Sequence, residues 1–303
     1  MKLLLIGLGK MGGNMARRWL RAGHQVIGYN RSSGITDQIA TEERLTPVYS
    51  IEEGIAKLTS PRVVWLMVPS GQATEDNLNH VAELLEAGDI LVDGGNSNFN
   101  DSIRHGKMMA EKGIQFFDAG VSGGVWGLKE GYAVMVGGNS EAFNNIEPLV
   151  KSLAPAVDKG WGLVGPVGAG HFTKMVHNGI EYGMMEAYAE GYELMKSRAD
   201  FQLDLHQVSE IWRYSSVVRS WLLDLISLAL VEDQDLSKIK PWVTDSGEGR
   251  WTVNEAINQS VPVPVIAAAL FRRFESREEN SYAYKLLSAV RNQFGGHEMK
   301  TVE

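Results

Sequence analysis

The first half of the chain alternates short apolar runs with stretches of helical periodicity, and this alternation limits the possible folds most strongly. The periodicity predicts helices over Met11–Ala22, Ala73–Leu85 and Ser102–Lys112. Strands are predicted at Lys2–Ile6, Gln25–Tyr29, Arg62–Met67, Ile90–Asp93, Ile114–Asp118, Ala133–Val136 and Gly162–Val164. Alternating strands and helices predict an α/β fold of the Rossmann type, a doubly wound parallel sheet wrapped by helices.

The character of the sequence changes near residue 165. Residues 168–196 carry a long helical pattern without strand signals, and Val265–Glu275 and Asn280–Val290 are also helical in pattern. The stretch Pro241–Arg250 is predicted to be a loop. A chain of 303 residues corresponds to about two domains. We therefore expect a dinucleotide-binding domain over 1–165 and an all-helical domain for substrate binding and dimerisation over 166–303.

Composition excludes several classes of function. A formal net charge of −8 argues against a nucleic-acid partner held by a general basic field. The chain has no cysteine, which removes disulfides and thiolate nucleophiles and fits a cytoplasmic location. The seven histidines show no metal-ligand spacing, so no metal is expected. No apolar run approaches the roughly 18 residues of a membrane span.

A glycine-rich turn follows the first predicted strand. It contains the residues Gly7, Leu8, Gly9, Lys10, Met11 and Gly12, a G-x-G-x-x-G pattern that opens a helix. The first glycine permits the tight turn, the second lets the backbone approach a pyrophosphate, and the third lets the helix pack on the strand. The helix N-terminus would attract the phosphates. We predict a dinucleotide site, the alternative being a glycine-rich turn without a ligand.

The end of the second predicted strand bears on the choice of cofactor. An acidic residue there would bind the ribose 2′-hydroxyl of NAD, but the chain has Asn30, Arg31 and Ser32. A guanidinium beside a hydroxyl suits a 2′-phosphate, so NADP is favoured and NAD remains possible. Arg31 could instead stack on the adenine, which NAD would also allow.

The long helical pattern after residue 168 contains the candidate catalytic residues. Lys174, His177, Asn178 and Glu181 stand at i, i+3, i+4 and i+7, which places them on one helical face. A buried lysine can accept a proton and a glutamate can donate one. The alternative is a solvated polar face.

Residues around this polar stripe, which consists of Lys174, His177, Asn178 and Glu181, are expected to support it. The apolar residues Met175, Val176, Ile180 and Met184 lie largely off the stripe and are expected to pack inside. Gly168 and Gly170 precede the stripe, and we expect them to let a ligand or cofactor approach the backbone.

The run KMVHNGIEYG, preceded by GAGHFT, resembles the signature of the 6-phosphogluconate dehydrogenase family. The Asp93–Ser97 and Val121–Gly124 loops, GLGKMGGN and NRS also match, so the resemblance covers nearly the whole chain. It implies an oxidoreductase of the pentose phosphate pathway and gluconate utilisation. The reaction would convert 6-phosphogluconate to ribulose 5-phosphate and CO2 with reduction of NAD(P). It also implies a homodimer or homotetramer.

The resemblance implies a role for each matching residue. Lys174 would be the general base and Glu181 the acid that protonates C1. Val68 and Asn96 would border the nicotinamide. The sugar acid would be held by Asn96, Ser122, Gly123, Gly124, His177 and Asn178, and its phosphate by Tyr182, Arg273, Arg291 and His297. In the family, the last arginine and the histidine reach the neighbouring subunit's site.

One departure affects the phosphate site. Long family members have a lysine where this chain has Ser246, so one positive contact is missing or is replaced by Arg250. The chain resembles the short branch of the family, whose members often prefer NAD. Two other hypotheses stay open. The protein could oxidise another β-hydroxy acid, although Tyr182, Arg273 and Arg291 argue against it, or be a non-catalytic dinucleotide-binding regulator.

Overall fold

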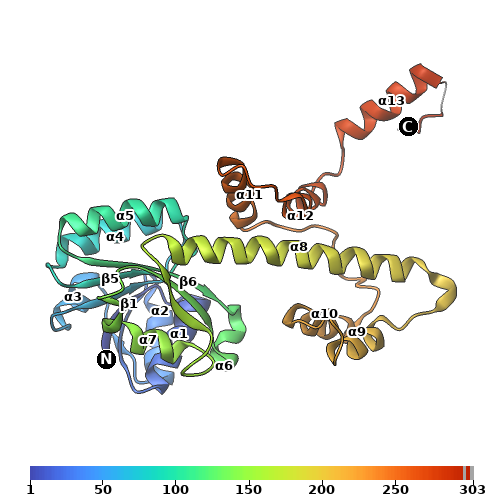
Figure 1. Cartoon of the computed structure of the whole chain (residues 1–303). Coiled ribbons are helices and arrows are strands. Elements are labelled where there is room, and N and C mark those ends of the chain that lie inside the picture. Colours follow the sequence, from blue (N-terminus) through green and yellow to red (C-terminus); the bar gives the residue numbers. More distant parts are fainter. Residues whose placement is uncertain (296–297, 301–303) are drawn as a thin grey trace. The chain divides into compact units, whose positions relative to one another are not determined.

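The structure is a computed structural model that describes residues 1–295 and 298–300 (Figure 1). The chain divides into two compact units, Met1–His177 and Asn178–Glu303. Helix α8 (Ala169–Ser197) is continuous across this division. The predicted domain boundary at residue 165 coincides with the end of the last strand, and it stays a prediction.

The first unit is built on one sheet. Its strands, within the described residues, are β1 (Lys2–Ile6), β2 (Gln25–Tyr29), β3 (Thr46–Pro47), β4 (Val63–Leu66), β5 (Ile90–Asp93), β6 (Gln115–Ser122), β7 (Ala133–Gly137) and β8 (Trp161–Gly165). Their order is β3-β2-β1-β4-β5-β6-β7-β8. The Rossmann-type fold is therefore confirmed.

The sheet is not wholly parallel. Strand β7 runs antiparallel to β6, with Gly120 opposite Met135, whereas the other pairs are parallel. Residues 123–132 return the chain at the end of β6 without a long crossover, which is the connection an antiparallel pair allows. Every predicted strand is present, and only the two-residue strand β3 was not predicted.

Helices cover both faces of the sheet (Figure 1). One face packs against α1 (Lys10–Arg21), α2 (Ser33–Glu42) and α7 (Glu147–Leu153). The other packs against α3 (Ile51–Ala56), α4 (Gln72–Leu84) and α5 (Phe99–Glu111). Strands with helices on both faces are apolar throughout, which explains runs such as the fully buried VVWL of β4.

The second unit is helical, as predicted. Besides the C-terminal part of α8 it contains α9 (Leu205–Arg213), α10 (Trp221–Glu232), α11 (Glu248–Asn258), α12 (Pro264–Glu275) and α13 (Tyr282–Gly295). Helix α11 begins at Glu248, so the predicted loop Pro241–Arg250 ends three residues earlier than expected. No helix of the described residues is long and apolar enough to cross a membrane.

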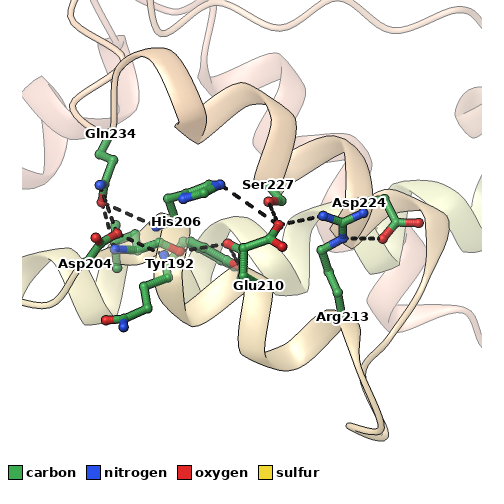
Figure 2. A network of polar contacts seen from close by, with 11 residues as sticks. Tyr192, Asp204, His206, Glu210, Arg213, Asp224, Ser227 and Gln234 are labelled. Carbon is green, nitrogen blue, oxygen red and sulfur yellow. Dashed lines mark hydrogen bonds and ion pairs between the residues drawn. The ribbon is translucent and has the colours of Figure 1, made fainter.

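A polar network joins α9 to α10 (Figure 2). Arg213 donates to Glu210 of its own helix at 2.5 Å and to Asp224 of α10 at 2.7 Å, and Ser227 of α10 also donates to Glu210. Hydrogen bonds, first from Ser227 and then from Arg213, lower the pKa of Glu210. This network ties the two helices together and uses none of the predicted site residues.

Candidate active site

A cavity of about 650 Å³ lies in the first unit and collects most of the predicted cofactor residues. Its lining includes Gly7, Gly9, Lys10, Met11, Gly12, Asn30, Arg31, Ser32, Val68 and Asn96. Leu8 is the exception, because its side chain is fully buried in the core. The sequence interpretation missed Tyr29, Met67, Pro69, Ala73 and Asn77, which also line the cavity. The available signal was their position: Tyr29 ends β2, Met67 and Pro69 follow β4, and Ala73 and Asn77 lie in the first turns of α4.

The three glycines of the turn fit the roles expected of a dinucleotide site. Gly7 has φ +97°, and a Cβ there would lie 2.4 Å from the Met67 carbonyl oxygen. A Cβ on Gly12 would lie 2.0 Å from the Gly7 oxygen, whereas one on Gly9 would meet nothing within 4 Å. Gly7 and Gly12 are therefore fixed by packing, and Gly9 leaves open space at the N-terminus of α1. This is the space that a pyrophosphate needs.

Asn30 holds the turn in place. Its Oδ1 accepts a hydrogen bond from the Leu8 amide at 3.0 Å, and its Nδ2 donates to the Ser32 carbonyl at 3.1 Å. Arg31 and Ser32 are exposed at the cavity, and Arg31 has no acidic partner among the described residues. Ser32 is the N-cap residue of α2 and its side chain makes no capping bond. A free guanidinium beside a helix N-terminus is an arrangement that attracts a phosphate.

Glu75 ties together the two helices that follow the loops carrying Val68 and Asn96. From α4 it accepts hydrogen bonds from Arg104, at 2.9 and 2.6 Å, and from His105 at 2.8 Å, both on α5. These bonds, chiefly those from Arg104, hold the pKa of Glu75 at about 2. The carboxylate is therefore ionised at neutral pH, and the cavity loops that carry Val68 and Asn96 have a common support.

Asp118 fixes the beginning of α8. This fully buried residue of β6 accepts hydrogen bonds from the Gly168 amide at 2.6 Å and from the His171 amide at 2.8 Å. The first amides of a helix have no partner within the helix, and a carboxylate satisfies them and favours the positive end of the dipole. Asp118 thus caps α8 from the sheet, a role that sequence analysis missed because no local spacing links residues 50 positions apart.

Glycines let α8 approach the sheet closely. A Cβ on Gly170 would lie 2.5 Å from the Asp118 carbonyl oxygen, and one on Gly120 would lie 2.5 Å from the Lys174 Cβ. Gly168 has φ +96° and packs against Ile103 of α5. The close approach expected at Gly168 and Gly170 is present, but it is an approach to protein, and the expectation of a ligand there is wrong.

The polar stripe lies on α8, because the helix is continuous over Ala169–Ser197. Lys174, Asn178 and Glu181 are half-buried, and His177 is exposed. Lys174 packs against Gly120 of β6, and this contact fixes its position. Gly120 directly precedes Val121, the first residue of the predicted substrate loop. Of the apolar residues, Met175 is buried, whereas Ile180 and Met184 are exposed, so the expectation that these two pack inside is wrong.

The predicted substrate loop follows β6 directly. Ser122 is the last residue of the strand, and Gly123 and Gly124 have φ of +142° and +52°. A Cβ on Gly124 would meet nothing within 4 Å. Neighbouring Val121 lines the dinucleotide cavity together with Asn96. The loop and Asn96 therefore belong to the same end of the sheet, where the C-termini of parallel strands usually bind ligands.

In the second unit, Tyr182, Ser246 and Arg273 form one cluster. The buried Tyr182 accepts a hydrogen bond from the Ser246 amide at 2.9 Å, and the two hydroxyl oxygens are 3.2 Å apart. The Arg273 guanidinium lies 3.6 Å from the centroid of the Tyr182 ring and donates to the Thr244 carbonyl at 2.8 Å. The structure thus brings together two of the predicted phosphate residues with Ser246, the position at which the sequence resemblance implies a lysine in long family members.

The other predicted phosphate residues are placed differently. Arg250 donates to both carboxylate oxygens of Asp245, at 2.8 and 3.1 Å, and lowers the pKa of that group. It is therefore already engaged and is a poor substitute for the missing lysine. Arg291 is exposed on α13, where it lines a separate hollow with Tyr284. His297 lies outside the described residues.

The described residues contain no group of three or more His, Cys, Asp or Glu side chains that could hold a metal ion. The cavity of the first unit is instead lined by glycines, which expose backbone amides, and by the guanidinium of Arg31. These groups suit a phosphorylated dinucleotide rather than a metal.

Comparison with known proteins identifies the family. Residues 2–162 match the NAD binding domain of 6-phosphogluconate dehydrogenase, and residues 170–303 match the C-terminal domain of 6-phosphogluconate dehydrogenase. The chain belongs to the 6-phosphogluconate dehydrogenase family. It is an oxidoreductase of that kind with a nicotinamide dinucleotide site, as the sequence resemblance implied.

Individual 6-phosphogluconate dehydrogenases match over the whole chain. YqeC of Bacillus subtilis (strain 168), whose name assigns it provisionally to this family, is 42% identical over 98% of each chain. The NAD(+)-dependent, decarboxylating enzyme of Haloferax volcanii is 38% identical over 99% of this chain and 98% of its own. The 6-phosphogluconate dehydrogenase of Plasmodium falciparum, solved with NADP+ and with 6-phosphogluconate, superposes with a TM-score of 0.85. It is 29% identical, and this chain spans 66% of its length.

Proposed function

We propose that the protein oxidises and decarboxylates 6-phosphogluconate to ribulose 5-phosphate and CO2 while reducing NAD(P). The observation that carries the proposal is Lys174 on α8, whose beginning is capped by Asp118 in the unit that contains the dinucleotide cavity. Glu181 lies two turns further along the same helix. The names of the Haloferax and Plasmodium relatives support the same activity.

In this proposal each step has an assigned group. A nicotinamide dinucleotide held at the turn of Gly7, Gly9 and Gly12 would supply the acceptor for the hydride that leaves C3 of the substrate. Lys174 removes the proton of the 3-hydroxyl, and its ammonium then stabilises the enolate oxygen that develops as CO2 leaves. Glu181 assists protonation of C1. The loop from Ser122 to Gly124, with Asn96, His177 and Asn178, holds the sugar acid, and Tyr182 and Arg273 bind its phosphate. Arg291 and His297 remain assigned from the family resemblance alone.

Initial rates with 6-phosphogluconate, unphosphorylated gluconate and 3-hydroxyisobutyrate test the substrate. We expect 6-phosphogluconate to be strongly preferred, because Arg273 supplies a charged donor for the phosphate. A preference for an unphosphorylated acid would favour the β-hydroxy-acid alternative, and no turnover with any of them would favour a non-catalytic role.

We propose NADP as the preferred cofactor, with NAD as the alternative. Arg31 lines the cavity beside the N-terminus of α2 and has no acidic partner in the part of the chain that the structure describes. The Arg31→Ala variant should raise the Michaelis constant for NADP by about 10- to 100-fold, because it loses one charge-assisted hydrogen bond. The Michaelis constant for NAD should change little. Initial rates with both cofactors measure this. Arg44→Ala, an exposed arginine outside the cavity, is the control, and equal effects on NAD and NADP would contradict the assignment.

We also propose that the protein is a homo-oligomer of two or four subunits in the cytoplasm. The helical unit exposes many large apolar side chains, among them Trp221, Leu228, Val231, Phe271 and Leu287. Exposed apolar surface of this extent is typical of subunit interfaces.

A further inference from the structure

Glu248 is a buried carboxylate that the proposed mechanism does not use. It is the first residue of α11 and only 2% exposed. An acidic residue in the first turn of a helix is favoured by the dipole, but an exposed side chain would serve that purpose without the cost of burial. The burial of Glu248 therefore needs a further explanation, and its hydrogen-bond partners provide one.

Those partners belong to the proposed substrate site. The Oε2 atom of Glu248 accepts hydrogen bonds from Nδ2 of Asn178 on α8 and from the Ser246 hydroxyl, the latter at 2.9 Å. Ser246 in turn contacts the Tyr182 hydroxyl with its amide and its Oγ. One carboxylate oxygen thus connects Asn178 to the cluster that contains Tyr182.

The packing of α11 on α8 is shaped to make this contact. A Cβ on Gly249 would lie 2.6 Å from the Tyr182 ring, and a Cβ on Gly179 would lie 2.8 Å from the Thr252 side chain. These glycines directly follow Glu248 and Asn178. Any larger residue would separate the two helices, so the close approach that lets the carboxylate reach the amide depends on both.

The contact decides which way the Asn178 amide points. The Nδ2 atom of Asn178 donates to Oε2 of Glu248, so the NH2 group of the amide faces the carboxyl group. The oxygen, Oδ1, is on the opposite side of the amide group, and its two lone pairs allow it to accept hydrogen bonds from more than one donor. An acceptor suits a hydroxyl group of a sugar acid, whereas the carboxylate and phosphate groups of the same substrate need donors.

We propose that Glu248 is a positioning residue that fixes the Asn178 amide so that Oδ1 accepts a hydrogen bond from a substrate hydroxyl. The inference rests on the proposed function and adds a residue to it. Glu248 acts through Asn178 and does not touch the substrate. Its removal should therefore weaken substrate binding without affecting the dinucleotide.

The test compares Glu248→Met, which keeps the side-chain length and removes the acceptor, with Glu248→Gln, which keeps an acceptor oxygen. Glu248→Met should raise the KM for 6-phosphogluconate about tenfold, the effect of losing one charged hydrogen bond, with the KM for the dinucleotide unchanged. Glu248→Gln should stay within about threefold of the wild type. Glu255→Gln, also on α11, is the matched control and should behave as the wild type.

Coupling to Asn178 separates positioning from a general structural role. In an Asn178→Ala background, Glu248→Met should raise KM less than about twofold further, because its target is gone. A full tenfold increase there, or no increase in the single variant, would overturn the inference. A wild type that neither binds nor oxidises 6-phosphogluconate would instead overturn the proposed function, and this inference with it.

A second pair of variants keeps the inference testable if Glu248→Met does not fold. Asn178→Asp places two carboxylates face to face and should raise KM more than tenfold. Adding Glu248→Gln reverses donor and acceptor and should recover most of that loss. Equal KM values for Asn178→Asp and for the double variant would overturn the inference.

Discussion

Replacing Lys174 with methionine is expected to lower kcat for 6-phosphogluconate by about 10²- to 10⁴-fold, the usual contribution of a positioned acid–base group. Methionine keeps the unbranched stem that packs beside Gly120, so the helix should stay in place. Only the amine that accepts and returns the proton is lost. The dinucleotide cavity does not include Lys174, and cofactor affinity should therefore be unchanged.

Initial rates and a fluorescence titration with the reduced cofactor would measure the two effects of Lys174→Met separately. Lys196→Met is a suitable control, because Lys196 lies on the same helix but pairs with Asp235 at the surface. An unchanged kcat in Lys174→Met would remove this residue from the mechanism. A loss of cofactor binding together with activity would show that the substitution disturbs the fold.

The second large effect is expected at Asp118. The Asp118→Ala variant leaves the buried amides of Gly168 and His171 without an acceptor, which should lower the free energy of unfolding by about 3 kcal/mol. Activity should also fall, because the cap sets the position of α8 and hence of Lys174.

Denaturant unfolding followed by circular dichroism, with activity measured in parallel, tests the role of Asp118. Asp118→Asn keeps one acceptor oxygen and should lie between the wild type and Asp118→Ala. Asp158→Ala, at an exposed position, should change neither quantity. A fully stable and active Asp118→Ala variant would contradict the assignment of Asp118 as the cap of α8.

Features that depend on local pattern could be predicted from the sequence. The strands have continuous apolar runs because helices cover both faces, and α8 was predicted within one residue at each end because its periodicity is long. Strand β3 was missed because two residues carry no pattern. The antiparallel direction of β7 was missed because an apolar run does not encode strand direction.

Features that depend on distant partners could not be predicted. Asp118 has no sequence signal that links it to Gly168, and Glu248 stands in a glycine-rich stretch that was predicted to be a loop. Gly168 and Gly170 indicated a close approach without indicating what approaches. The spacing of Lys174 and Glu181 could be predicted because both residues lie on one helix. The hydrogen bond between Asn178 and Glu248 joins two helices, and the two residues are 70 positions apart in the sequence.

The most direct test of the account follows both products of one substrate. Wild type and Lys174→Met would be supplied with 6-phosphogluconate labelled with ¹³C at C1, and the reduced cofactor and ¹³CO2 would be measured together. We expect the wild type to form the two in equal amounts and Lys174→Met to form almost none of either. Reduced cofactor without ¹³CO2 from the wild type, or equal yields from both proteins, would contradict the proposal that Lys174 serves an oxidative decarboxylation.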